Sequence, residues 1–335
     1  MFCNSTKDVN FQRKRGLSLV YYCKKCRKYF SINFKPLDEQ QILEDHLDGL
    51  SFKKIGKRYG IGKTTAWEIC NKKLKELPNS NHFTHKYCSK WSSTYIVDGK
   101  YIPVKGYKRD IPLLWGVDYN KHDFPVFMLA RSENLAAWLK YFELCRILKI
   151  SFNLLVCDDN PSIKYAARDK YPNIQIQMCY NHFKESLRKT LRTRSVDTYK
   201  PFVQSLEELF SKKRSTEDFN RMLFSIFETY KKDKVCLEII VDIERRKDEF
   251  LAFQGYSRAP VTNNLIECFN SHLEDRVKSI RSFQSFKHAQ LWLNGYILKR
   301  RYTKFTSCSG KFKRLNGRFP LEFTKRDDVV LPDLF

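Results

Sequence analysis

The feature that most limits the possible folds of this chain is a run of alternating strand-like and helix-like segments in its middle third. Three short apolar runs separated by polar turns come first, and two more follow, each after a segment with apolar residues at helical spacing. The strands are predicted at Tyr95–Val97, Leu113–Tyr119, Phe124–Ala130, Phe152–Cys157 and Ile174–Met178, and the helices at 135–148 and Ser162–Lys170. The order indicates a mixed sheet made of a meander and two crossover connections.

This order is that of an RNase H-like sheet in an α/β fold. From Phe183 to about Phe253 the sequence is highly charged, rich in helix-forming residues and free of glycine, so an all-helical segment is predicted there. A further amphipathic helix is predicted from about Asn263 to Val277. We therefore expect an RNase H-like domain over residues 93–182 and 254–300, interrupted by a helical insertion over residues 183–253.

A partial zinc ribbon is predicted for residues 1–34. Cys23 and Cys26 form a C-x2-C knuckle, and Cys3 is the one candidate ligand upstream of it. A structural zinc site needs four ligands. Zn²⁺ is therefore possible in this segment, but its ligand set is incomplete.

Residues 37–76 are expected to form a helix-turn-helix. Lys63, Thr64 and Thr65 would begin its recognition helix and contact DNA. The alternative is a small helical bundle with a solvated basic face. Residues 77–92 contain Pro, Ser and Asn without a period and indicate a linker, and residues 301–335 indicate a basic C-terminal tail.

The charge balance points to a polyanionic partner. The 335 residues include 62 Lys and Arg against 37 Asp and Glu, a formal net charge of +25. Such an excess fits nucleic acid, whose phosphates release counterions when basic side chains replace them. A polybasic membrane surface is the alternative, but the charge is spread along the chain and no apolar stretch is long enough to span a bilayer. We expect a soluble protein of the cytoplasm or nucleoid, or of the nucleus in a eukaryotic host.

Three acidic residues occupy positions suited to binding metal. Asp98 and Asp158 each end a predicted strand, and Glu267 lies on the helix predicted from Asn263. If the two strands are neighbours, both aspartates emerge at one edge of the sheet, where the helix can add the third carboxylate. Such a set can hold two divalent cations about 3.5–4 Å apart for in-line displacement at a phosphodiester. The sequence therefore predicts two Mg²⁺ or Mn²⁺ ions bound by these acids.

Spacing alone leaves alternatives open around each acid. Asp159 competes with Asp158, Asp118 also ends a strand, and Glu274 lies on nearly the same helix face as Glu267. Asp158 is favoured because it directly ends the apolar run.

Polar residues near these acids are candidates for contacting DNA. Asn263 and Asn264 could cap the helix or contact substrate. Cys179 and His182 form a C-x2-H pair with no second pair at metal-binding distance, so a buried thiol with a capping histidine is an equal alternative to a functional role.

Taken together, these motifs resemble those of DDE transposases of the Mutator-like type, which include many bacterial insertion-sequence transposases. The resemblance rests on VDGKYI around Asp98, LLVCDDNPSIKYAA around Asp158, MCYNHF around the C-x2-H pair and TNNLIECFNSHLEDRVKSIRSF around Glu267. It implies metal-dependent cleavage and transfer of DNA strands by Asp98, Asp158 and Glu267. It also implies a C-x2-H pair near the active site and DNA. Asp159 departs from the glycine that usually follows the second aspartate.

The implied partners are the terminal inverted repeats of a transposon and its target DNA, bound by a homodimer or higher oligomer. We also expect basic residues of the insertion, such as Lys212, Lys213 and Arg214, to hold the cut end. The competing functions are a DNA-binding regulator, a domesticated and inactive transposase, and an RNase H-like nuclease or resolvase.

Overall fold

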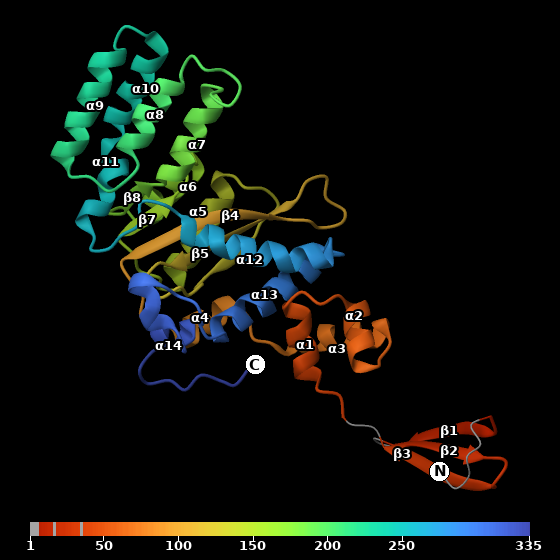
Figure 1. Ribbon diagram of the computed structural model, residues 1–335. Coiled ribbons are helices and arrows are strands. Elements are labelled where there is room, and N and C mark those ends of the chain that lie inside the picture. The colour runs from red at the N-terminus through yellow and green to blue at the C-terminus, as the bar shows by residue number, and fades with distance from the viewer. Residues whose placement is uncertain (1–6, 16–17, 34–35) are drawn as a thin grey trace. The chain divides into compact units, whose positions relative to one another are not determined.

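The computed structural model describes residues 7–15, 18–33 and 36–335, which form two compact units. The first unit comprises residues 1–46 and 52–73, and the second comprises residues 47–51 and 74–335. Both are shown in Figure 1. Within the described residues, no helix is both long enough and apolar enough to cross a membrane.

A small antiparallel sheet begins the first unit, with strand order β1-β2-β3. Its strands are β1 (Val9–Arg15), β2 (Ser18–Cys23) and β3 (Lys28–Asn33). Cys23 ends β2 and Cys26 lies in the turn before β3, so the C-x2-C segment forms a tight β-turn. The third predicted ligand, Cys3, lies outside the described residues, so zinc binding stays a prediction.

Three helices follow, α1 (Glu39–Leu47), α2 (Phe52–Tyr59) and α3 (Lys63–Glu76). Apolar residues at helical spacing, including Ile42, Ile55 and Ile69, are buried between them. Gly60 takes a positive φ of 66°, which ends α2 at a sharp turn before α3. The residues that begin α3 are exposed.

The second unit contains the mixed sheet expected from the sequence, with strand order β6-β5-β4-β7-β8. Strand β4 pairs antiparallel with β5 and parallel with β7, and β7 pairs parallel with β8. The strands are β4 (Thr94–Ile102), β5 (Ile111–Asp118), β6 (Phe127–Leu129), β7 (Leu154–Cys157) and β8 (Gln175–Met178). Asp98 therefore lies within β4 rather than at its end, because antiparallel pairing with β5 continues to Ile102.

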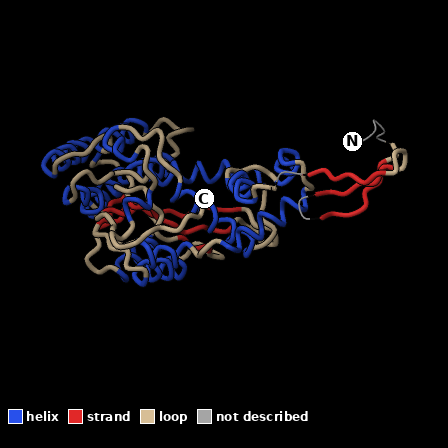
Figure 2. Tube along the Cα trace, turned by 90° about the horizontal axis from the view of Figure 1, so that it is seen from below, coloured by secondary structure: helices blue, strands red, loops and turns tan. Residues whose placement is uncertain are grey.

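Helices cover both faces of this sheet, as Figure 2 shows. On one face, α5 (Leu135–Ile147) and α6 (Pro161–Lys170) form the main apolar core with Tyr95 and Val97 of β4. Because side chains alternate along a strand, Asp98 points to the other face. That face carries α12 (Asn264–Ile280), which runs across β4 and β5 in Figure 1. α13 (Phe286–Tyr302) follows α12 in the chain.

The segment predicted to be an all-helical insertion contains helices and no strand. Its elements are α7 (Tyr180–Thr190), α8 (Lys200–Leu209), α9 (Thr216–Tyr230), α10 (Lys234–Arg245), α11 (Lys247–Leu251) and the short helix η1 (Ala252–Gly255). They stand together as one block in Figure 1. Helix α11 joins the block to the rest of the unit. It packs against β8, and its Glu249 pairs with Lys164 at 2.6 Å and with Arg168 at 2.7 Å on α6.

One basic residue predicted to hold the cut DNA end, Arg214, is bound within the helical block. Arg214 is buried, and its guanidinium donates to the carbonyls of Leu209 and Glu208 and to the Asp218 carboxylate. Its hydrogen bonds therefore stabilise the turn between α8 and α9.

Two segments differ from their predicted irregular form. The predicted linker contains helix α4 (Ser80–Tyr87), which Asn79 caps by accepting from two backbone N–H groups. The predicted C-terminal tail contains a short helix, η2 (Gly310–Leu315), and α14 (Pro320–Thr324). Arg301 and Leu321 of this segment are fully buried. Apolar residues of the segment, including Tyr302, Phe319 and Phe335, pack with Leu321 against α4 and α13, and their irregular spacing gave no periodic pattern in the sequence.

Candidate active site

The register of the sheet brings Asp98 and Asp158 side by side. Strands β4 and β7 are parallel with Ile96 opposite Val156, so two residues further along each strand Asp98 lies level with Asp158. The β4–β7 pairing ends before this point, which leaves both carboxylates at the carboxyl end of the paired region. The sequence predicted that both aspartates would emerge at one edge of the sheet, whereas Asp98 lies within β4 and Asp158 directly after β7.

The two carboxylates repel each other at a partly buried position. Burial, followed by the charge of Asp158, raises the pKa of Asp98 to about 6, although the Gly99 N–H and the Asn270 amide oppose this. Asn270, on α12, donates to Asp98 Oδ2 at 2.6 Å and is itself held by the indole N–H of Trp115 at 3.0 Å. Burial also raises the pKa of Asp158, with a further contribution from Glu133. The site therefore carries excess negative charge held in a fixed position.

Glu267 lies in the first turn of α12, on the same helix face as Asn270. Its Oε1 is 3.5 Å from Nε2 of His182 on α7. The Cys179 side chain and the carboxylates of Glu267 and Asp158 raise the pKa of His182 to about 9, against the opposing effect of burial. His182 lies close enough to Asp98, Asp158 and Glu267 for its charge, when protonated, to act on all three acids.

The other residues of the C-x2-H and Asn-Asn motifs join α7 to α12. Cys179 and Asn263 are both fully buried, and the thiol donates to Asn263 Oδ1 at 3.2 Å. Neither side chain reaches the surface in this structure, and their contact with DNA stays a prediction. Asn264 is exposed and accepts from the Asn181 amide at 2.9 Å. Asn263 occupies the N-cap position of α12 without making a side-chain cap.

The three rival acids are engaged elsewhere. Asp159 pairs with Lys164 at 2.5 Å and with Arg246 at 2.6 Å, and these cations lower its pKa despite burial. Asp118 lies opposite Tyr95, away from Asp98, and accepts from the backbone and hydroxyl of Ser92. Glu274 pairs with Lys100 at 2.8 Å. Asp159, Asp118 and Glu274 are therefore each held by other partners, and the choice of Asp158 and Glu267 as site residues stays a prediction.

Glu133 is a fourth carboxylate at the site that the sequence did not reveal. It precedes α5 and accepts hydrogen bonds from Tyr101 at 2.9 Å, Asn160 at 3.1 Å and Trp138 at 3.3 Å. Asn160 in turn donates its backbone N–H to Asp158 Oδ1 at 3.2 Å. Glu133 therefore positions the loop that holds Asp158. No local pattern marks it, because its partners come from three separate segments.

Gly99 leaves the space that the Glu133 carboxylate occupies. A Cβ atom at residue 99 would lie 2.6 Å from Glu133 Oε2, closer than any stable contact. Gly99→Ala is expected to displace Glu133 from its three hydrogen-bond donors and to lower activity at this site by about 10- to 100-fold, since small misplacements near reacting groups have effects of that size.

The matched control for this substitution is Gly255→Ala, where the added Cβ meets nothing closer than 3.7 Å. Rates of DNA end cleavage, the reaction that the sequence motifs imply, are measured for the two variants together with the thermal unfolding of each. Equal rates for Gly99→Ala and the unchanged chain would show that the position of Glu133 does not matter.

Among residues 7–15, 18–33 and 36–335, no three His, Cys, Asp or Glu side chains lie close enough together to bind a metal ion. Two of the predicted ligands, Asp98 and Asp158, come together, and the carboxylate of Glu267 is directed to His182. Joint binding of metal by the three stays a prediction.

Comparison with known proteins identifies the family. The model of the family described as "Transposase, Mutator family" matches residues 50–297, well over half of the 335 residues. The chain therefore belongs to the Mutator family of transposases, which confirms the resemblance found in the motifs. No curated protein matches the chain.

Among solved structures, one match is described as "CryoEM structure of simian T-cell lymphotropic virus intasome in complex with PP2A regulatory subunit B56 gamma". The identity is 12% and the TM-score 0.23, and the match covers 56% of this chain and 66% of that one, just under two thirds of its length. A likeness this low carries no argument about fold or function.

Proposed function

We propose that the chain is a DDE transposase with an RNase H-like catalytic domain, which cleaves DNA at transposon ends and joins the freed ends to target DNA in a metal-dependent reaction. The observation that carries this proposal is the register of β4 and β7. It sets Asp98 level with Asp158, on the side of the sheet crossed by the helix that bears Glu267. Membership of the Mutator family of transposases supports the same reaction class.

The residues at the site fit divalent metal. Carboxylate oxygens are the ligands that Mg²⁺ and Mn²⁺ prefer. Asp98 and Asp158 repel each other at a partly buried position, and a cation between them would relieve the repulsion that raises the pKa of Asp98. Asp98, Asp158 and Glu267 would hold the ions, with Glu267 turning on α12 from His182 towards the aspartates.

When bound, a pair of such ions activates the attacking oxygen and stabilises the leaving oxygen of a phosphodiester. The protein groups hold this site in place. Asn270 and the Gly99 N–H fix the Asp98 carboxylate, and the Asn160 N–H fixes Asp158. His182 places a positive charge beside the same acids, where a DNA phosphate would approach.

DNA recognition is assigned to the N-terminal unit. Helices α2 and α3, separated by the turn at Gly60, have the lengths and order of a helix-turn-helix, and Lys63, Thr64 and Thr65 are exposed where α3 begins. The proposed partners are terminal inverted repeats and target DNA, bound by a homodimer or higher oligomer in the cytoplasm or nucleoid.

Replacing Lys63, Thr64 and Thr65 together with alanine should weaken the binding of transposon-end DNA. Unchanged affinity in a gel-shift assay would contradict this role.

Metal removal tests the catalytic proposal. The purified full chain is incubated with DNA that carries the inverted repeats flanking its gene, in Mg²⁺, in Mn²⁺ or in EDTA. Cleaved ends and joined products are expected with either metal, and DNA binding alone in EDTA. A chain that binds the ends yet never cleaves them with any divalent ion would instead be an inactive transposase or a regulator.

A further inference from the structure

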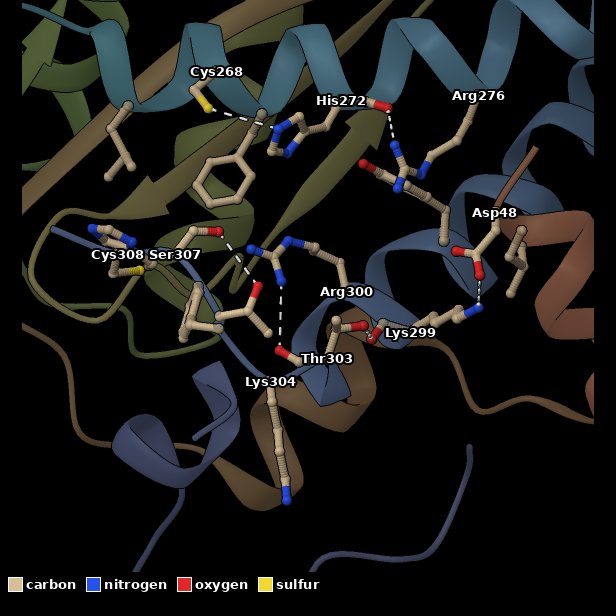
Figure 3. Close-up of a pocket in the computed structure, with 17 residues that line it drawn as sticks. Asp48, Cys268, His272, Arg276, Lys299, Arg300, Thr303, Lys304, Ser307 and Cys308 are labelled. Carbon is tan, nitrogen blue, oxygen red and sulfur yellow. Dashed lines mark hydrogen bonds and ion pairs between the residues drawn. The ribbon is translucent and has the colours of Figure 1, made fainter. Parts of the chain in front are cut away.

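A second site lies on the other side of α12 from the acids. A pocket of about 540 Å³ is formed by α12, the last turns of α13 and the segment that follows it, all within the second unit (Figure 3). The residues of α12 that line it include Phe269, His272 and Arg276. At 3.6 residues per turn these face away from Glu267 and Asn270. One helix therefore separates the two sites.

Arg300 of α13 is the central cation of this pocket. Its guanidinium lies between the rings of Phe269 and Phe305, at 5.1 and 5.0 Å from their centroids. Its hydrogen bond to the Thr303 carbonyl is long at 3.5 Å. Within the described part of the chain it pairs with no carboxylate. The two rings therefore hold a planar donor group in a fixed orientation with most of its N–H groups unused.

The pocket contains little negative charge to balance its cations. Asp48 is its single carboxylate, and it pairs with Lys299 at 2.7 Å. Arg276 donates to the carbonyl of His272 at 2.8 Å and, among the described residues, has no acidic partner. Figure 3 shows Arg276 and Arg300 reaching into the space between α12 and α13. Two arginines without acidic partners in one pocket are suited to a phosphate group.

The positive charge continues beyond the pocket. His122, buried at its edge, has its pKa lowered to about 4 by burial and then by the charges of Arg300, Arg314 and Lys311. Arg258 lies beyond, where its charge lowers the pKa of Lys311 after the larger effect of burial. Lys311 Nζ also donates to the Arg258 carbonyl at 2.8 Å. Cations that extend beyond the pocket fit a chain of phosphates better than a single small anion.

We propose that this pocket binds a backbone phosphate of DNA, held by Arg276 and Arg300 on the face of α12 opposite Glu267. The site rests on the proposed function for its choice of ligand. It would bind a phosphate other than the one being cleaved. Because α12 carries ligands on both faces, DNA in the pocket would fix the helix that presents Glu267 to the metal site.

The test measures the affinity of the full chain for end DNA in EDTA over a range of salt concentrations. Removing one side chain that binds a phosphate should reduce the slope of log affinity against log salt by about 0.9. Arg276→Gln and Arg300→Gln are each expected to weaken binding by about 10-fold and to reduce this slope by about one. Arg276→Lys, which keeps the charge, should recover most of the affinity. Thermal unfolding identifies any variant that fails to fold. Arg276 is half-buried and its guanidinium donates to a backbone carbonyl, so Arg276→Gln tests the pocket if Arg300→Gln does not fold.

The matched control is Lys140→Gln, which removes one exposed charge from α5 on the far face of the sheet. It should leave the salt slope unchanged. Wild-type affinity and slope in both arginine variants would overturn the proposal. A second outcome would also overturn it: arginine variants that no longer bind inorganic phosphate or dAMP in calorimetry but bind DNA as tightly as the unchanged chain. The pocket would then be a site for a small anion and not for DNA. These measurements need no cleavage, so a chain that fails to cleave DNA but shows the expected salt slopes would refute the catalytic proposal and leave this one standing.

Discussion

Asp98→Asn, Asp158→Asn and Glu267→Gln are each expected to lower DNA end cleavage by about 10³-fold or more while leaving DNA binding unchanged. Each substitution removes a charged oxygen ligand without changing the size of the side chain. Binding persists because it depends on basic residues elsewhere. Cleavage of labelled end DNA under single-turnover conditions gives the rates, and gel-shift affinity in EDTA gives the binding.

The chain offers a matched control for two of these acids. Asp159→Asn alters the carboxylate next to Asp158, which is paired with Lys164 and Arg246. Glu274→Gln alters a carboxylate on the same helix as Glu267, which is paired with Lys100. Both variants should keep cleavage within about 10-fold of the unchanged chain. An inactive Asp159→Asn beside an active Asp158→Asn would reverse the assignment of the second aspartate.

The raised pKa of Asp98 adds a second readout. Its pKa is about 6 in the folded chain and about 3.9 when unfolded, so the ionised carboxylate destabilises the metal-free fold. This penalty is absent below about pH 4, grows as the pH rises to 6 and is complete above it. Asp98→Asn should therefore raise the midpoint of thermal unfolding in EDTA at pH 7.5, and not at pH 4.

Protons also compete with metal for Asp98, so cleavage below pH 6 should need more Mg²⁺.

Asp123→Ala is expected to destabilise the second unit by about 3–5 kcal/mol, the usual cost of leaving a buried charge without its partner. The Arg301 guanidinium donates to both oxygens of Asp123, at 2.6 and 2.8 Å, and neither side chain is exposed to solvent. Thr84 of α4 and Thr324 of α14 complete the network with hydrogen bonds of 2.8 and 2.6 Å. One ion pair thus joins the loop before β6 to three helices.

Urea unfolding followed by circular dichroism measures this effect. The double variant Asp123→Leu/Arg301→Met removes both charges together and should be less destabilised than Asp123→Ala, since no unpaired charge remains. Glu274→Gln, which breaks a partly exposed ion pair, should cause little change. If Asp123→Ala unfolds at the same urea concentration as the unchanged chain, the network does not stabilise the C-terminal segment.

The sequence alone determined the order of elements and the positions of the acids. Apolar runs of strand length and helical periods are local patterns, so they predicted the five strands of the mixed sheet, the helical block and the helix that bears Glu267. Parallel pairing of two such strands then required Asp98 and Asp158 to meet. The local sequence pattern did not predict α4, which contains few apolar residues. It also did not show that β4 continues past Asp98.

Only the tertiary structure decided which polar groups are free for chemistry. Arg246 and Lys164 neutralise Asp159, Glu133 reaches the site from the segment before α5, and Arg301 is buried against Asp123, 178 residues earlier in the chain. Each outcome depends on a partner that is remote in sequence. Burial and pairing set the charge and the availability of an ionisable group, and both depend on how distant segments pack together.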